Sequence, residues 1–186
     1  MHNPKHFTIK LALFVAAILV IAPAAMAQDV ASGSATATVQ AALVVTADQA
    51  LAFGTVFQGV ATSVANNVSA SSGIFKIVGQ SSAGIAIYMQ LPDYLATATG
   101  DDRMVIAFST TDCNIDSTDN NDPALFVAGS GWINEDPHNV TSAALIGSDV
   151  TVQTSIFLGG SVTPTVDQTP GAYTADIVLT VAYTGT

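Results

Sequence analysis

The residues best suited to chemistry lie in one acidic, polar stretch, residues 110–138. Asp112, Asn114 and Asp116 alternate there, and alternate oxygen side chains in a loop can converge on a calcium ion, as in an EF-hand. The EF-hand pattern then fails, because Pro123 stands at the twelfth position, where a bidentate Glu is required. The sequence therefore predicts no cofactor beyond a calcium candidate at these three residues.

Hydrolytic chemistry finds little support elsewhere. Beyond its first few residues the chain has one histidine, His138, and its one cysteine is Cys113, too few for the three or four nitrogen and sulfur ligands of a zinc site. Neither serine in Gly79–Gly84 has a glycine two residues away on both sides, as a nucleophile elbow requires. Glu135 and Asp136 are adjacent, so on an extended chain they point to opposite sides and cannot form a glycosidase pair. We expect that the protein is not an enzyme.

Residues 1–27 have the pattern of a cleaved secretory signal peptide. Lys5 and Lys10 precede an apolar run from Leu11 to Ala22, and a small-residue site, Ala25–Ala27, follows. The run is shorter than the roughly 20 residues that a membrane-spanning helix needs. We therefore expect a protein without an integral membrane segment that is secreted, periplasmic or on the cell surface of a bacterium.

The charge of the mature chain limits its partners. Cleavage leaves 159 residues (186 minus 27), in which Lys76 and Arg103 are the only cations against 14 carboxylates, a net charge of 2 minus 14, or −12. Such a chain cannot neutralise phosphates, so nucleic acid is excluded as a partner. With one cysteine it also has no internal disulfide, and its stability must come from strand pairing and apolar packing.

The elements that would position these residues are β-strands. Short alternating runs of apolar and polar residues are separated by Gly, Asn, Asp and Pro, without a helical period, which predicts an all-β fold with a single immunoglobulin-like β-sandwich. Gly159-Gly160 and Pro170-Gly171 are predicted turns. The expected strands span residues 37–45, 51–57, 74–78, 85–91, 104–109, 125–127, 150–158 and 173–183.

Several of these segments carry a family resemblance. They are Leu51-Ala52-Phe53-Gly54, Gly73 to Gly79, Ile85 to Pro92, Pro170 to Thr174 and Val181-Ala182-Tyr183. In this order and spacing, over about residues 35 to 186, the chain resembles the bacterial exported family called domain of unknown function 4402. That family is similar to the immunoglobulin-like subunits of fimbriae and spore coats. The resemblance implies a structural or adhesive surface protein, and it identifies no functional residue.

The N-terminal segment, residues 28–48, has a second role in this interpretation, as a candidate donor strand ahead of the sandwich at 49–186. In β-augmentation a strand of one subunit completes the sheet of another, and its alternate side chains fill pockets. The inserting side chains would be Ala37, Val39, Ala41, Leu43 and Val45. The partners would be a homopolymer or other surface subunits. The same strand could instead pair within its own chain, and the sequence leaves both arrangements open.

A binding module is the alternative function. It would be a secreted, calcium-assisted β-sandwich that binds a glycan or another ligand through Trp132, Tyr94 and the acidic stretch 110–138, which is expected to be a long surface loop. Trp132 would then be an exposed platform, whereas a structural tryptophan would cap the end of the core.

Overall fold

The computed structural model describes most of the chain after the predicted leader. The described residues are 29–126, 131–140, 143–144 and 151–184. The predicted signal peptide, residues 1–27, therefore lies outside the described residues. The chain divides into two units at Thr38 and Val39. In the first unit, residues 29–38 are all exposed and form no helix or strand.

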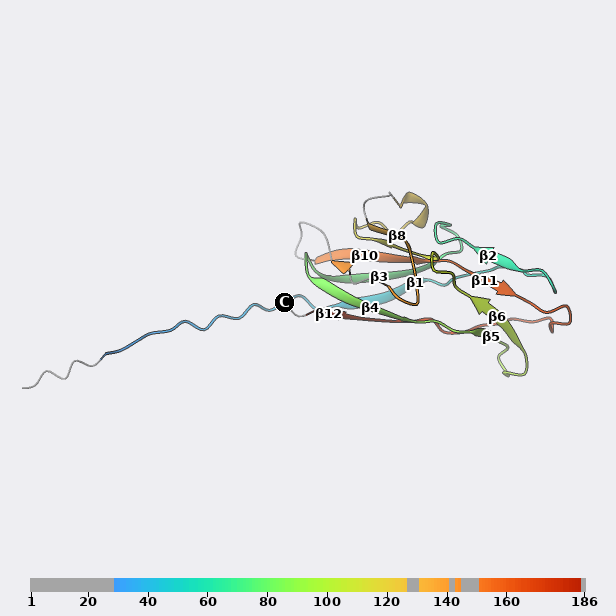
Figure 1. Cartoon of the computed structure of the whole chain (residues 1–186), viewed down its shortest axis with the longest axis horizontal. Coiled ribbons are helices and arrows are strands. Elements are labelled where there is room, and N and C mark those ends of the chain that lie inside the picture. The colour runs from blue at the N-terminus through green and yellow to red at the C-terminus, as the bar shows by residue number, and fades with distance from the viewer. Residues whose placement is uncertain (1–28, 127–130, 141–142, 145–150, 185–186) are drawn as a thin grey trace, which may run out of the picture. The chain divides into compact units, whose positions relative to one another are not determined.

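The second unit is an all-β sandwich built from antiparallel sheets, as the alternating pattern predicts. The strands are β1 (Val44–Gln49), β2 (Thr62–Val64), β3 (Gly73–Gln80), β4 (Gly84–Gln90), β5 (Tyr94–Ala96), β6 (Arg103–Ala107), β7 (Cys113–Asp116), β8 (Gly131–Glu135), β9 (Ala143–Ala144), β10 (Thr151–Leu158), β11 (Gly160–Thr163) and β12 (Val178–Tyr183), with a 3-10 helix, η1, at Pro123–Leu125. Their order is β1-β3-β10-β7-β8 in a five-stranded sheet, β2-β11-β6-β5 in a four-stranded sheet and β12-β4-β9 in a three-stranded sheet. Figure 1 places β3 and β10 in one layer, with β4 and β12 in the other.

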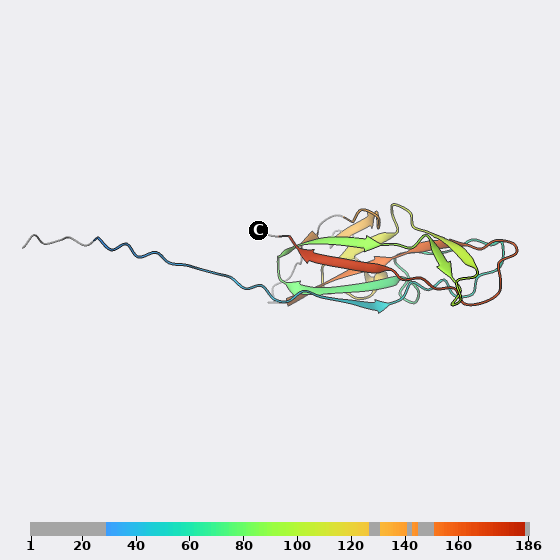
Figure 2. The same ribbon diagram turned by 90° about the horizontal axis from the view of Figure 1, so that it is seen from below.

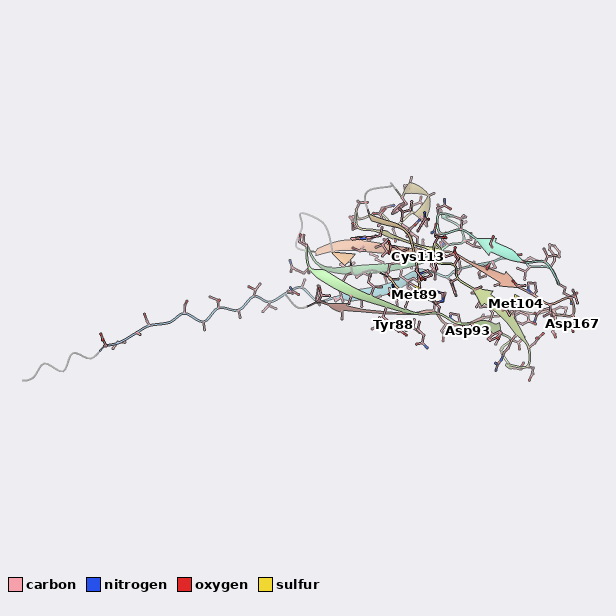
Figure 3. The ribbon with its side chains drawn as sticks, viewed as in Figure 1. Tyr88, Met89, Asp93, Met104, Cys113 and Asp167 are labelled. Atoms are coloured by element: carbon pink, nitrogen blue, oxygen red, sulfur yellow. The ribbon has the colours of Figure 1, made fainter. Side chains whose placement is uncertain are left out.

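Strand β4 illustrates how the sequence period creates two faces. Its alternate residues Ile85, Ile87 and Met89 are buried, whereas Tyr88 is 65% exposed. Figure 3 labels Tyr88 and Met89, which are adjacent in the sequence and lie on opposite sides of the strand. Successive side chains of a strand point to opposite faces, so apolar residues at every second position direct one face to the core.

Two apolar clusters fill the sandwich. The larger cluster lies between the five-stranded and three-stranded sheets and contains Phe75, Ile77, Ile85, Ile87, Met89, Cys113, Ile115, Ile156 and Leu158. The smaller cluster lies on the four-stranded sheet and contains Met104, Ile106 and Val162. Burial of these side chains supplies the apolar packing that replaces a disulfide.

The predicted turn at Gly159-Gly160 is wrong, because the chain passes there from one sheet to another. Strand β10 ends at Leu158 and β11 begins at Gly160, so the chain crosses here from the five-stranded to the four-stranded sheet. A Cβ atom on Gly159 would lie 2.6 Å from the backbone oxygen of Val64 and 2.8 Å from the backbone nitrogen of Asn66. Glycine is required because another backbone passes this close, not because the chain reverses.

Four other expectations need correction. The first strand is Val44–Gln49 rather than 37–45, and residues 51–57 contain no strand. The acidic stretch 110–138 is not one long loop, because it contains β7 and β8. Residues 125 and 126 of the expected strand 125–127 belong to η1 and its C-terminal cap, and residue 127 lies outside the described residues. Tertiary pairing with β10 selects Cys113–Asp116 as a strand despite its polar composition.

Thr154 generates the first prediction. It lies opposite Ile77, so it faces the larger cluster, and among the described residues its buried Oγ1 atom lacks a hydrogen-bond partner. Thr154→Val replaces that hydroxyl with a methyl group of similar shape, and we expect the free energy of unfolding to rise by about 1 kcal/mol. Urea denaturation measures the change, with the exposed Thr163→Val as control. A less stable Thr154→Val protein would contradict the assignment.

Candidate functional site: an open side of the sandwich

One side of the sandwich is open because two edge strands meet there. Strand β1 ends the five-stranded sheet beside β3, and β12 ends the three-stranded sheet beside β4. Only three residues separate β3 from β4, so both edges lie on the same side. Figure 2 shows that β1 extends past β12, with no strand of the three-stranded sheet over it.

The side chains of β1 that face inward have little cover. Val45 and Ala47 pair with Ile77 and Phe75, two residues of the larger cluster, and paired residues share a face of the sheet. Val45 is nevertheless 36% exposed, and Ala47 is also exposed. These two residues therefore occupy core-facing positions without a complete core above them.

The facing strand β12 has the same pattern. Leu179 pairs with Met89 and Val181 pairs with Ile87, so both point inward, and both are only half-buried. We call this open side the seam and define it by Val45, Ala47, Leu179 and Val181. It is an uncharged apolar strip between two free strand edges.

The seam continues into a groove of about 760 Å³. Its walls are residues 50–58, which follow β1, and residues 169–175 and 177, which lead into β12. Its floor is the smaller cluster, in which Met104 is labelled in Figure 3. Phe57 on one wall is 70% exposed, and none of the groove's lining residues is charged.

Side-chain hydrogen bonds close the two ends of this side. At the β12 end, the Tyr183 hydroxyl donates to the Ala41 carbonyl oxygen (2.9 Å) and accepts from the Gln80 backbone N–H (2.7 Å). The Gln80 side chain accepts from the Ala41 N–H at 3.2 Å. At the far end, Gln58 Nε2 donates to the Gln168 carbonyl oxygen at 2.5 Å. Residues from the N-terminal and the C-terminal half of the chain thus meet at both ends of the open side.

A cluster of hydrogen bonds around Asp102, which we call the Asp102 cluster, holds Thr169 and Tyr173 in the second wall of the groove. The Tyr173 hydroxyl lies 2.7 Å from Asp102 Oδ2 and accepts from Gln168 Nε2 at 2.9 Å. The Thr169 N–H donates to the same carboxylate oxygen at 2.9 Å, and the Arg103 N–H donates to Asp102 Oδ1 at 2.8 Å. The hydrogen bond from Tyr173 is the largest cause that holds the pKa of Asp102 well below its usual range, followed by hydrogen bonds from Thr169.

The structure separates the five predicted inserting residues into two groups. Ala37 and Val39 are exposed, Val39 by 91%, and neither belongs to a strand. Ala41 is fixed by Gln80 and Tyr183, Leu43 packs against the larger cluster, and Val45 pairs with β3 of its own chain. Within the described residues, the part left for exchange is therefore residues 29–40, which we call the N-terminal tail.

The three calcium candidates already have partners within the protein. An oxygen of Asp112 accepts from the Ser109 N–H, and Asn114 Oδ1 accepts from the Asn134 N–H. Asp116 is buried, and its two oxygens accept from Thr118 and Asn120 (2.6–3.0 Å). Among the described residues no group of three or more His, Cys, Asp or Glu side chains could hold a metal ion. The oxygens serve the fold of this segment.

The residues of the predicted binding module are not gathered at one site. Trp132 is half-buried on β8, opposite Ile115, and packs against the larger cluster, so it is not an exposed platform. Tyr94 lies on β5, at the edge of another sheet.

The other two candidates for chemistry have structural positions. Cys113 is buried, and desolvation, followed by the charges of Glu135, Asp112 and Asp136, raises its pKa to about 12. Nδ1 of His138 lies 3.2 Å from Oδ1 of Asp136. The thiol is therefore neither accessible nor ionised at neutral pH.

Comparisons with protein-family models, curated proteins and solved structures found no match to this chain. The resemblance to domain of unknown function 4402 therefore stays a prediction. What the fold itself defines is an all-β sandwich with one open side. Among the described residues no helix is long and apolar enough to cross a membrane.

Sequence reasoning missed the residues that build this side. Val45 was assigned to the inserting strand, and Phe53 and Phe57 to a strand of the sandwich, although both phenylalanines line the groove. Asp102 and Tyr173 meet across 71 positions of sequence, and no local pattern joins them. The signal that the sequence offers for the groove is residues 50–58, a largely apolar run without a charged residue.

Because of the Asp102 cluster, we expect the stability of the protein to depend on pH. A carboxyl whose pKa is depressed by folding adds stability above its unfolded pKa of about 3.9, and that stability is lost as the pH falls through the folded value. We expect Asp102→Asn to melt below the native chain at neutral pH and the gap to narrow under acid conditions. Thermal melts across pH measure it, with Asp101→Asn as matched control. Equal melting temperatures at neutral pH would contradict this role.

The calcium candidates generate a prediction of their own. Because the oxygens of Asn114 and Asp116 accept hydrogen bonds from the chain itself, we expect millimolar calcium, on the order of the weaker extracellular sites, to leave the melting temperature unchanged. A calcium titration followed by thermal melting measures this. A saturable rise that disappears in Asp116→Asn would restore the calcium site.

Proposed function

We propose that this chain is an exported structural or adhesive surface protein whose copies assemble by strand complementation. In this arrangement an N-terminal strand of one subunit occupies the open side of another sandwich. Main-chain hydrogen bonds supply affinity, and alternate side chains supply fit. The predicted signal peptide and the resemblance to fimbrial subunits support export and a surface role, and the open side of the sandwich supports assembly by strand complementation.

The observation that carries the proposal is the exposure of inward-facing residues at the seam. A strand edge offers unpaired N–H and C=O groups, and proteins usually protect it with charges, proline or a bulge. Strand β1 has such devices, because Asp48 and a register shift between Ala47 and Gln49 interrupt its edge. Strand β12 has neither charge nor proline, and it pairs with β4 in an unbroken register.

A second candidate is a binding module for an apolar molecule. The groove volume of about 760 Å³ lies within the roughly 300–1,000 Å³ of small-molecule sites, and its lining carries no charge. Such a module would be a single, self-contained domain. It therefore differs from the first candidate in whether copies assemble.

Detergent gels of the protein recovered from the native cell surface distinguish the two functions. Main-chain hydrogen bonds along a whole strand give a strand-exchanged contact its affinity, so we expect an unboiled sample to give a ladder that collapses to one band on boiling. An antibody to this chain detects the bands, and the boiled half of each sample is its control. A single band near the mature mass in both lanes would contradict assembly and favour the binding module.

A further inference from the structure

We propose that the occupant of the seam is the N-terminal tail, residues 29–40, of a second copy of this chain. The tail adds a strand to the free edge of β12 and covers the inward face of β1. This inference rests on the proposed function and adds the donor residues, the acceptor strand and the inserted side chains.

The acceptor position follows from the two sheets. A strand added beside β12 extends the three-stranded sheet in the direction in which β1 already extends beneath it (Figure 2). It therefore lies over Val45 and Ala47, the two inward-facing residues that remain exposed. The six residues of β12 offer their second backbone edge without a charge or a break in register.

The donor matches this position in period and in size. In the N-terminal tail, Ala35, Ala37 and Val39 alternate with polar residues, so an extended conformation presents all three on one face. Their small side chains suit a strip whose deeper layer, with Phe75 and Ile77, is already buried. The tail residues are exposed and form no strand in the described part of the chain.

A chain cannot readily fill its own seam with its own tail. Ala41 is fixed through both its N–H and its carbonyl group by Gln80 and Tyr183, at the end where β3 finishes and β4 begins. To return along the seam, the tail would have to reverse within residues 40–43. That segment, Gln-Ala-Ala-Leu, has no Gly, Asn, Asp or Pro, the residues that tight reversals favour. The tail of another copy meets no such constraint.

Charge favours this contact over others between copies. The mature chain carries a net charge of −12, so most of its surfaces repel one another. Residues 30–47 contain no charged residue, and neither does β12. Apart from Asp29 at its start, the tail is thus uncharged like the seam, on a protein that is otherwise acidic.

The contact is heterologous, because the tail and the seam are different surfaces of the same chain. A heterologous contact that does not close into a ring generates a linear assembly. Each copy donates its tail once and accepts one tail. The proposed polymer therefore has one copy with a free tail at one end and one with an open seam at the other.

Paired variants of the full chain, produced in the native cell, test this arrangement. Val39→Asp places a charge on the inserting face of the tail, and Ala47→Arg fills the seam. Their matched controls, Thr38→Asp and Thr46→Arg, alter the neighbouring residues on the opposite faces. We expect both controls to keep the ladder on unboiled gels. Each test variant alone loses the ladder, and co-production of the two variants gives a dimer and no longer species.

The outcomes separate the two proposals. A native chain without a ladder overturns the proposed function. A ladder that persists in Ala47→Arg or in Val39→Asp overturns the inference alone, because assembly then proceeds without the seam or without the tail. Loss of both ladders without a mixed dimer overturns it as well. Thermal melts verify folding, and Ala47→Gln and Val39→Ser replace any variant whose melting temperature falls.

Discussion

The five-stranded sheet is wider than the three-stranded sheet that covers it, and this mismatch determines the rest of the structure. The chain passes from β3 to β4 through three residues, so the edges β1 and β12 fall on the same side. Because β1 has no strand above it, its inward-facing Val45 and Ala47 stay exposed. An edge of this kind is a template for another strand, which makes the open side the part of the protein most suited to assembly.

The polar stretch after β7 has a structural role on the opposite face. Strand β10 is central in the five-stranded sheet, and its outward-facing Ser155 and Phe157 are fully buried. Ser155 contacts Asn121, whose amide also donates to Asp48, and Asp122 contacts Ser69. These contacts hold residues 120–122 against neighbouring segments. Asn121 and Asp122 thus tie this segment to the sandwich.

The alternating pattern was sufficient to predict the sandwich and strands β3, β4 and β6, because their buried faces repeat with a period of two. Strand β10 was also expected, although its residues 153–158 are all buried and show no such period. The alternating pattern could not predict β7, in which the side chain of Asn114 finds its partners in the distant residues Asn66 and Asn134. It also placed Val45 on the inserting strand, since alternation shows that a strand has an apolar face but not which sheet covers it. The open side depends on sheet widths, a property of the assembled fold.

Hydrogen–deuterium exchange of residues 29–40 decides whether the tail pairs with another strand, because it reports whether those backbone amides are hydrogen-bonded. The measurement compares the native chain with Ala47→Arg, both produced in the native cell. Strand complementation predicts slow exchange in the tail and in β12 of the native chain and faster exchange in both segments of Ala47→Arg. Equally fast exchange of the tail in the two proteins would contradict strand complementation.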